Sequence, residues 1–193
     1  MGTSLTKGQN TSLTQDGTPL ADVTVGLGWD VGDDGTAFDL DAAALVCGPG
    51  NKVLSDAHFV FYNNLALPGG AVRHLGDNTT GAGEGDDERI TVDLDGLDAA
   101  DGVEQVVFTV SIHDAATRGQ DFGKVRDAYI RVVDNATGRE MCRYELSYDA
   151  ASETAMVFGA LYRRGGEWKF RAIGQGYDSG LAGIAADYGV TLD

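Results

Sequence analysis

The chain has 193 residues, of which 42% are hydrophobic, and this fits one globular domain spanning residues 1–193. Its 30 acidic and 14 basic side chains give a formal net charge of -16. Such a charge argues against a nucleic-acid-binding protein, because binding to phosphates needs clustered Lys and Arg. The sequence shows neither a signal peptide nor the roughly 18 consecutive apolar residues of a membrane span. We therefore expect a cytoplasmic protein without an integral membrane segment.

Short segments rich in β-branched or aromatic residues, bounded by Gly, Asp or Asn, predict a series of strands. In chain order, the predicted strands are 23–29, 43–47, 58–62, 90–94, 105–113, 127–134 and 139–147. The segment 105–113 is the clearest, because apolar residues from Val106 to Ile112 recur at every second position. The segments 155–163 and 168–172 flank two glycines and predict a hairpin, with a helix as the alternative for the first of them.

Helical patterns are brief. They predict helices at 115–118, 122–127 and 181–188, the last with apolar residues along one face. Many short strands with few helices predict a mainly β fold, namely a two-sheet β-sandwich with a few short peripheral helices.

Two glycine-rich windows between predicted strands hold a third of the carboxylates. The first contains Asp30, Asp33, Asp34, Asp39 and Asp41, and the second contains Asp77, Glu84, Asp86, Asp87 and Glu88. Ionised carboxylates a few ångströms apart repel by roughly 1 kcal/mol per pair in water and by more when shielded, so a folded site made from them needs a cation. Hard oxygen donors on flexible loops suit calcium best. Ordinary solvated turns are the alternative, since Asp, Asn and Gly dominate turns for local reasons.

The spacing within each window indicates candidate ligands. Asp39 and Asp41 alternate with Phe38 and Leu40, which places both carboxylates on one face of the chain. In the second window, the glycines allow a tight loop that turns oxygen atoms inward. Its oxygen donors are Asp77, Asn78, Asp86, Asp87 and Glu88. Neither window is an EF-hand, because the first has a glycine at its third position and the second lacks the sixth-position glycine.

No catalytic motif is present. The three histidines have no His or Cys partner at metal-ligand spacing, and neither a nucleophile elbow nor a phosphate-binding loop occurs. Cys47 and Cys142 are far apart and predict buried thiols rather than a zinc or redox site. We therefore expect no catalytic residues and no enzyme. A metal-dependent, hydrolase-like enzyme that uses the same acidic loops is the alternative.

Four early segments carry a family resemblance: Gly28-Trp29-Asp30, Phe38-Asp39-Leu40-Asp41, residues 59–65 and the run from Gly76 to Glu88. Together with later segments between residues 122 and 177, they make essentially the whole chain resemble the TerD family of tellurium-resistance and stress-response proteins. The resemblance implies a β-sandwich that binds calcium through its acidic loops and takes part in bacterial resistance to tellurite and other stresses. It implies no established enzymatic activity.

The resemblance also implies a set of metal ligands by position. These are Asp30, Asp39, Asp41, Asn64, Asp77, Asp86, Asp87 and Glu88, to which the oxygen-donor pattern adds Asn78. Asp33 and Asp34 are outer-shell or solvent candidates. We expect about two Ca2+ ions, because there are two acidic windows. We also expect a calcium-ordered surface that docks a protein partner in a stress-response complex or a membrane-associated complex.

Overall fold

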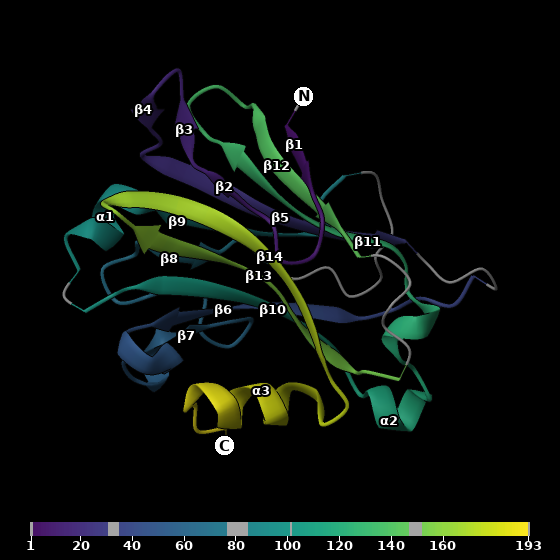
Figure 1. Ribbon diagram of the computed structural model, residues 1–193. Helices are drawn as coiled ribbons and strands as arrows, with labels where there is room; N and C mark the ends of the chain where they lie inside the picture. The colour runs from purple at the N-terminus through teal and green to yellow at the C-terminus, as the bar shows by residue number, and fades with distance from the viewer. Residues whose placement is uncertain (1, 31–34, 77–84, 101, 147–151, 193) are drawn as a thin grey trace.

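The computed structural model describes residues 2–30, 35–76, 85–100, 102–146 and 152–192. Within these ranges, two six-stranded sheets face each other and three short α-helices lie around them (Figure 1). The predicted mainly β sandwich with a few peripheral helices is confirmed.

The first sheet has the strand order β1–β12–β11–β5–β9–β8. Its strands are β1 (Thr3–Leu5), β12 (Glu140–Glu145), β11 (Arg126–Asp134), β5 (Asp22–Asp30), β9 (Glu88–Asp93) and β8 (Val72–His74). All neighbours are antiparallel except β1 and β12, which are parallel.

The second sheet has the strand order β2–β14–β13–β10–β6–β7, and all of its neighbours are antiparallel. Its strands are β2 (Asn10–Ser12), β14 (Glu167–Tyr177), β13 (Ala155–Arg164), β10 (Gln105–Ile112), β6 (Leu40–Cys47) and β7 (Phe59–Val60). A small hairpin of β3 (Thr14–Gln15) and β4 (Thr18–Pro19) follows β2.

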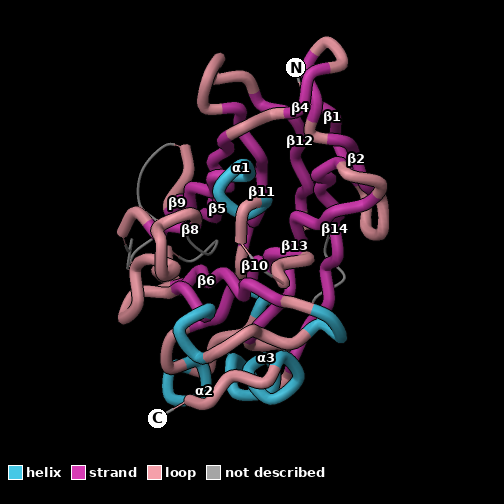
Figure 2. The backbone as a smooth tube through the Cα atoms, turned by 90° about the vertical axis from the view of Figure 1, so that its left-hand side faces the viewer, coloured by secondary structure: helices cyan, strands magenta, loops and turns pink. Residues whose placement is uncertain are grey.

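Alternating side chains build two separate hydrophobic layers. Between the sheets, Val25 and Leu27 of β5 pack with Ile130 of β11 and many other buried residues. On the outer face of the second sheet, Val107 of β10 packs in a cluster with Ile184 of α3 (Gly180–Tyr188). Figure 2 shows α3 and α2 (Ala115–Arg118) on the side of the second sheet that faces away from the first. Each sheet therefore keeps a distinct outer face, and that of the first sheet is free of these helices.

The segment before β3 contributes an edge strand to each sheet. β1 is the outermost strand of the first sheet, and β2 is the outermost strand of the second. Backbone hydrogen bonds from Gly8 N to Ala172 O (2.8 Å) and from Ala172 N to Gln9 O (2.9 Å) continue the pairing with β14. These strands are absent from the sequence prediction, because each is only two or three residues long.

The other differences from the predicted elements are local. The segment 155–163 is a strand rather than a helix, since β13 pairs with both β10 and β14. The predicted helix 122–127 is wrong beyond the turn η3 (Phe122–Lys124), because Arg126 already pairs with β5. The structure adds α1 (Leu94–Asp98), whose first turn is capped by the Asp93 side chain, and two further turns, η1 (Pro49–Asn51) and η2 (Asp56–His58).

The described parts of both acidic windows lie at one end of the sandwich. β5 ends at Asp30, β6 begins at Leu40, and β9 begins at Glu88, which pairs with Leu27 of β5. This end is on the right in Figure 1, whereas α1 lies at the opposite end, on the left. The sheet topology therefore collects residues that are up to 58 positions apart in the sequence, as in the hydrogen bond between Trp29 and Asp87.

Candidate metal centre

Two hydrogen bonds join the two acidic windows, and a third connects residues at the two ends of the first window. The backbone N–H of Trp29 donates to Oδ2 of Asp87 at 2.9 Å, and that of Ala42 donates to Oε2 of Glu88 at 2.7 Å. The indole N–H of Trp29 donates to the carbonyl of Phe38 at 3.2 Å. The windows thus form one connected region, with Asp30 and Asp41 directly beside the bonded backbone groups.

Asp86 lies on the outer face of the first sheet, where three donors hold its carboxylate. Oδ1 accepts hydrogen bonds from Nε of Arg131 at 2.8 Å and from the hydroxyl of Tyr129 at 2.9 Å. Oδ2 accepts one from Nη2 of Arg131 at 2.9 Å. The carboxylate rests against Gly26, where a Cβ would lie 2.2 Å from Oδ2. The hydrogen bond to Asp86 is the main reason why the pKa of the Arg131 guanidinium is raised.

Tyr129 is held between a glycine and a guanidinium. Its ring covers Gly28, whose Cβ, if present, would lie 2.5 Å from the ring and the hydroxyl. The guanidinium carbon of Arg143 lies 3.6 Å from the centroid of the Tyr129 ring, which is a cation–π contact. Burial raises the pKa of the Tyr129 hydroxyl, and its hydrogen bond to Asp86 adds to the effect. The hydroxyl is therefore a hydrogen-bond donor at neutral pH.

Asp87 is in a region of excess negative charge. Burial raises the pKa of its carboxyl group, and the charges of Asp30 and Asp86 raise it further. The hydrogen bond from the Trp29 backbone opposes this shift without cancelling it. Proximity of a cation would relieve the same repulsion, because a nearby positive charge favours the ionised carboxylate.

Glu88 is almost completely buried, with 1% of its surface exposed, and it connects the two sheets. Its Oε2 accepts from Ala42 of β6, and Nε2 of His74 lies 3.3 Å away. Because the Gly76 N–H donates to Nδ1 of His74 at 3.1 Å, Nε2 is the ring nitrogen that donates to Glu88. A predicted metal ligand therefore makes contacts that hold β6, β8 and β9 together.

Asp39 and Asp41 lie on the other side of the sandwich, at the outer face of the second sheet. Phe38 and Leu40 are buried between the sheets, so the predicted alternation is confirmed. Oδ2 of Asp41 lies 3.5 Å from Nδ1 of His113. Oδ2 of Asp39 lies 3.9 Å from Nη2 of Arg118 in α2. The structure therefore separates these two carboxylates from Asp86, which lies on the outer face of the first sheet.

Of the remaining predicted ligands, the structure describes only Asn64. The side-chain amide of Asn64 donates to the carbonyls of Phe59 at 2.7 Å and Ala57 at 3.3 Å, which stabilises the turn after β7. Asp77 and Asn78 lie outside the described residues, as do Asp33 and Asp34.

A cavity of about 380 Å³ lies beside Asp30 and is lined by Trp29, Asp30, Gly85, Asp127, Tyr129, Arg131 and Arg143. Asp127 is at a bulge in β11, where the register with β5 shifts and the residue has a φ of 49°. Sequence reasoning missed Asp127, Tyr129 and Arg131 as parts of this region. The available signal was the pair Tyr129 and Arg131, which share one face of a strand at alternate positions.

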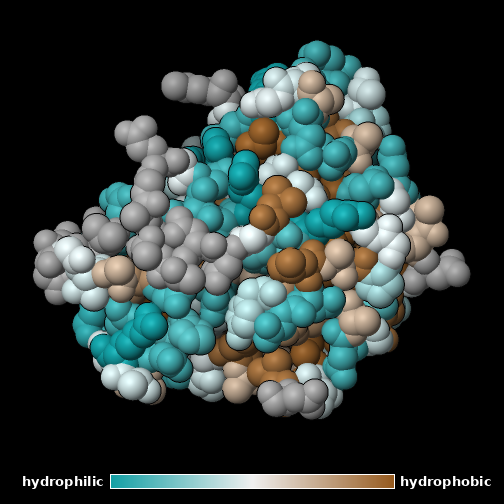
Figure 3. Space-filling model, turned by 180° about the vertical axis from the view of Figure 1, so that it is seen from behind, coloured by the Kyte–Doolittle hydropathy of each residue, from teal (hydrophilic) through white to brown (hydrophobic). Residues whose placement is uncertain are grey.

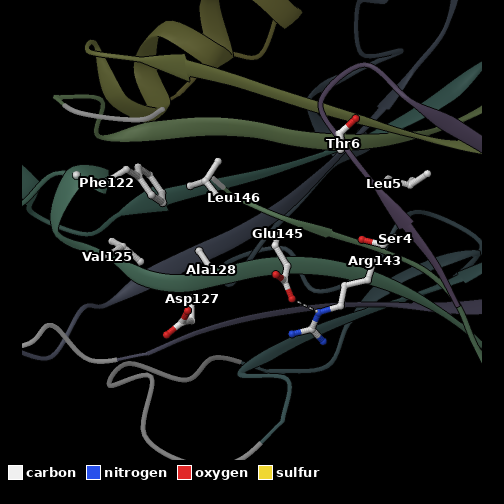
Figure 4. A pocket seen from close by; sticks show the side chains of 11 residues that line it. Ser4, Leu5, Thr6, Phe122, Val125, Asp127, Ala128, Arg143, Glu145 and Leu146 are labelled. Atoms are coloured by element: carbon white, nitrogen blue, oxygen red, sulfur yellow. Dashed lines mark hydrogen bonds and ion pairs between the residues drawn. The ribbon is translucent and has the colours of Figure 1, made fainter. Parts of the chain in front are cut away.

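A second cavity of about 710 Å³ adjoins the first and shares Asp127 and Arg143 with it. Figure 4 shows Leu5, Phe122 and Leu146 around it, and Arg143 paired with Glu145 at 3.1 Å.

Seen from behind, the molecule is mainly hydrophilic with separate hydrophobic patches (Figure 3). None of the helices in the described ranges has the length and apolar character that spanning a bilayer requires.

The described donors fit calcium in their chemistry, since Asp30, Asp39, Asp41 and Asp87 all offer carboxylate oxygens. Within the described part of the chain, no group of three or more His, Cys, Asp or Glu side chains is arranged to hold a metal ion. A calcium ion beside Asp30 and Asp87 would therefore need further oxygen ligands, which water and backbone carbonyls commonly supply.

Fold and site together define a two-sheet β-sandwich in which the described parts of two acidic windows are linked at one end. The model of the TerD domain family matches residues 1–188. The chain is 50% identical over 191 residues to "Tellurium resistance protein TerD" of Serratia marcescens, covering 98% of each chain. It is 47% identical over 194 residues to "General stress protein 16U" of Bacillus subtilis (strain 168), covering 100% of both.

A solved structure of a TerD homologue has a similar fold. The solved structure of a homologue of telluride resistance protein (TerD) from Streptomyces coelicolor A3(2) matches with a TM-score of 0.68 and 25% identity, covering 86% of this chain and 95% of that one. This chain therefore belongs to the TerD domain family of tellurium-resistance and general stress-response proteins. The names of these relatives describe resistance and stress and specify no enzymatic activity.

Proposed function

We propose that this protein is a calcium-binding member of the TerD family, in which the acidic loops bind about two Ca2+ ions and present a calcium-ordered surface to protein partners. The proposal includes a cytoplasmic location and a partner in a stress-response complex, either soluble or associated with a membrane. The relatives named for tellurium resistance and general stress support the physiological part of this proposal.

The observation that carries the calcium part is the environment of Asp87. Its carboxyl pKa is raised by burial and by the charges of Asp30 and Asp86, so the folded protein holds negative charges in an unfavourable arrangement. A bound cation reverses this cost, because it attracts the same carboxylates. Calcium suits the site better than magnesium, since it tolerates more ligands and less regular geometry.

The separation of the carboxylates supports two ions rather than one. Asp39 and Asp41 lie beside Arg118 and His113 at the outer face of the second sheet, whereas Asp30 and Asp87 lie at the end of β5. Hydrogen bonds of Trp29 and Ala42 link the two groups. Ion binding at one group would therefore help to order the backbone of the other, which is how metal occupancy would change a docking surface.

Thermal unfolding in EDTA and in increasing calcium, with magnesium as the comparison, tests the proposal. Calcium at 100 times its dissociation constant stabilises a protein by about 2.7 kcal/mol. For a chain of this length, the expected rise in melting temperature is roughly 5–10 °C. A saturable, calcium-selective rise is the expected result. No rise, or an equal rise with magnesium, would contradict a calcium site.

Two matched variants locate the effect. Asp87→Asn removes one charge beside Asp30, and we expect it to weaken the calcium-dependent rise. Asp95→Asn removes one charge from α1 at the opposite end of the sandwich, and we expect it to leave the rise unchanged. An equal loss in both variants would indicate a general counterion effect instead of a site.

The metal-dependent enzyme remains the competing function, because a cavity of about 380 Å³ lies beside Asp30. Turnover of a phosphate or carboxylate ester that requires calcium and is lost in Asp87→Asn would favour this alternative. Loss of calcium-linked stability and partner binding in Asp87→Asn, without turnover in the wild type, would favour the binding module.

A further inference from the structure

We propose that Arg131 is a positioning residue of the cation site, and that Asp86 is its anchor rather than a metal ligand. By holding Asp86 against Gly26, Arg131 fixes the backbone that carries the neighbouring carboxylate of Asp87. This inference rests on the proposed function, because it assigns a role in calcium affinity to a residue that touches no calcium.

Three hydrogen bonds from protein donors already hold the Asp86 carboxylate. Arg131 contacts both oxygens through a bidentate pair at 2.8 and 2.9 Å, and Tyr129 donates to Oδ1 at 2.9 Å. The Asp86 side chain is only 6% exposed. If Asp86 turned away to bind a metal, the partly buried guanidinium and hydroxyl would lose their acceptor, which is costly in a poorly hydrated place.

The glycines opposite these side chains are part of the same arrangement. A Cβ at Gly26 would collide with the Asp86 carboxylate, and one at Gly28 would collide with the Tyr129 ring. Both glycines are on β5, which ends two residues after Gly28 at Asp30. The glycines that leave room for the Asp86 carboxylate and the Tyr129 ring are therefore on the same strand as the candidate ligand Asp30.

Fixing Asp86 also restricts the backbone and side chain of the next residue, Asp87. The backbone N–H of Asp87 donates to the Leu27 carbonyl at 2.9 Å, and its carboxylate accepts from Trp29 at 2.9 Å. With Asp86 fixed on one side and Glu88 in β9 on the other, Asp87 has little freedom to move away from Asp30. Residues that orient ligands in this way commonly change metal affinity by about 10- to 100-fold.

Electrostatic repulsion alone predicts that replacing Arg131 raises calcium affinity, because Arg131 is a positive charge near the proposed cation. Competition between Arg131 and calcium for Asp86 predicts the same rise. However, Asp86 and Glu140 both pair with Arg131, the latter at 3.3 Å, and largely neutralise it. We therefore expect the loss of positioning to dominate, so that the sign of the change separates the two mechanisms.

Calcium titration calorimetry on the full chain tests the inference with three variants. We expect Arg131→Gln to lower calcium affinity by about tenfold or more. Arg131→Lys keeps the charge but lacks the planar fork, so we expect little rescue. Arg163→Gln is the matched control, because Arg163 lies over the Trp168 ring and pairs with Asp98 of α1 at the opposite end of the sandwich. Higher affinity in Arg131→Gln, or an equal loss in Arg163→Gln, would overturn the inference.

Amide hydrogen exchange in EDTA gives a readout that needs no metal. We expect faster exchange at the Trp29 and Asp87 amides in Arg131→Gln, and wild-type exchange in Arg163→Gln. Unchanged exchange in Arg131→Gln would refute the positioning role. If this variant does not fold, Tyr129→Phe removes one bond to Asp86 and must show a smaller change in the same direction. A wild type that binds no calcium would overturn the proposed function and the assignment of Arg131 to a cation site, whatever the exchange data showed.

Discussion

The carboxylate of Asp86 occupies the space that a side chain at Gly26 would need, because a Cβ there would lie only 2.2 Å from Oδ2. Gly26 also stands opposite Arg131 in the pairing of β5 with β11. The absence of a side chain at one position thus allows an ion pair between residues 45 positions apart. This explains why a glycine is placed within a strand, where it otherwise weakens the sheet.

We expect Gly26→Ala to destabilise the protein by about 1–3 kcal/mol, the usual cost of forcing a methyl group into filled space. The variant must displace Asp86 from Arg131, so it should also speed amide exchange at Asp87. Denaturant unfolding in EDTA measures the stability change. In the double variant Gly26→Ala/Asp86→Ala the alanine has room, so its additional cost should be much smaller than in the wild-type background. Equal costs in both backgrounds would show that the clash is not with Asp86.

We expect Glu88→Gln to cost about 1–3 kcal/mol, because a buried acceptor of two hydrogen bonds is replaced by an amide that must also place two N–H groups. The loss should be equal in EDTA and in calcium, since the contacts to Ala42 and His74 are structural. Chemical denaturation under both conditions checks this. The control Glu145→Gln alters an exposed ion pair and should cost less than about 1 kcal/mol. A loss seen only with calcium would instead make Glu88 a metal ligand.

The ionised Asp87 side chain should destabilise the folded protein when calcium is absent. Because burial, Asp30 and Asp86 raise its pKa in the folded state, the ionised group is unfavourable near neutral pH. Asp87→Asn keeps an acceptor for Trp29 and should therefore raise the melting temperature in EDTA, while lowering the gain from calcium. The folded protein binds the Asp87 proton more tightly than the unfolded chain does, so the wild type regains this stability as the pH falls through the raised pKa. The advantage of Asp87→Asn should shrink over the same pH range, and an advantage that grows towards low pH would contradict the assignment.

Both cysteine thiols are buried in the folded protein. Burial raises the pKa of Cys47 and of Cys142 to about 12, so little thiolate exists at neutral pH. We expect both to react with Ellman's reagent at least about tenfold more slowly in the native protein than in guanidinium at pH 8. Native reactivity equal to that of the unfolded chain would show an exposed thiol. Slow reaction would argue against tellurite reduction by these cysteines, which supports a binding role in the stress response.

The predictable part of the fold was the part set by short-range patterns. Alternation over 105–113 and the two glycines after residue 164 predicted β10 and the β13–β14 hairpin. The N-terminal strands β1 and β2 were not predicted, because they form only by pairing with β12 and β14, which are more than 100 residues away in the sequence. The helix expected at 122–127 failed for a similar reason, since pairing with β5 draws Arg126 into a strand.

The candidate site was predictable to a similar extent. Carboxylates crowded among glycines are visible in the sequence, but the groups that hold them are not adjacent to them. Asp86 is bonded to Arg131, and Glu88 to the backbone of Ala42, a donor that no residue type reveals. The sequence thus identified an acidic region, whereas only the fold divides its members between outer faces and the buried interface of the sheets.

The first twelve residues contain both β1 and β2, and each of these short strands is the outermost strand of a different sheet. A chain that began after residue 12 would uncover the hydrogen-bonding edges of β12 and β14 together. Uncovered edges pair readily with other chains, so the N-terminal segment protects against aggregation as well as completing the fold. An affinity tag for the experiments above is therefore better placed at the C-terminus, after α3, than next to β1.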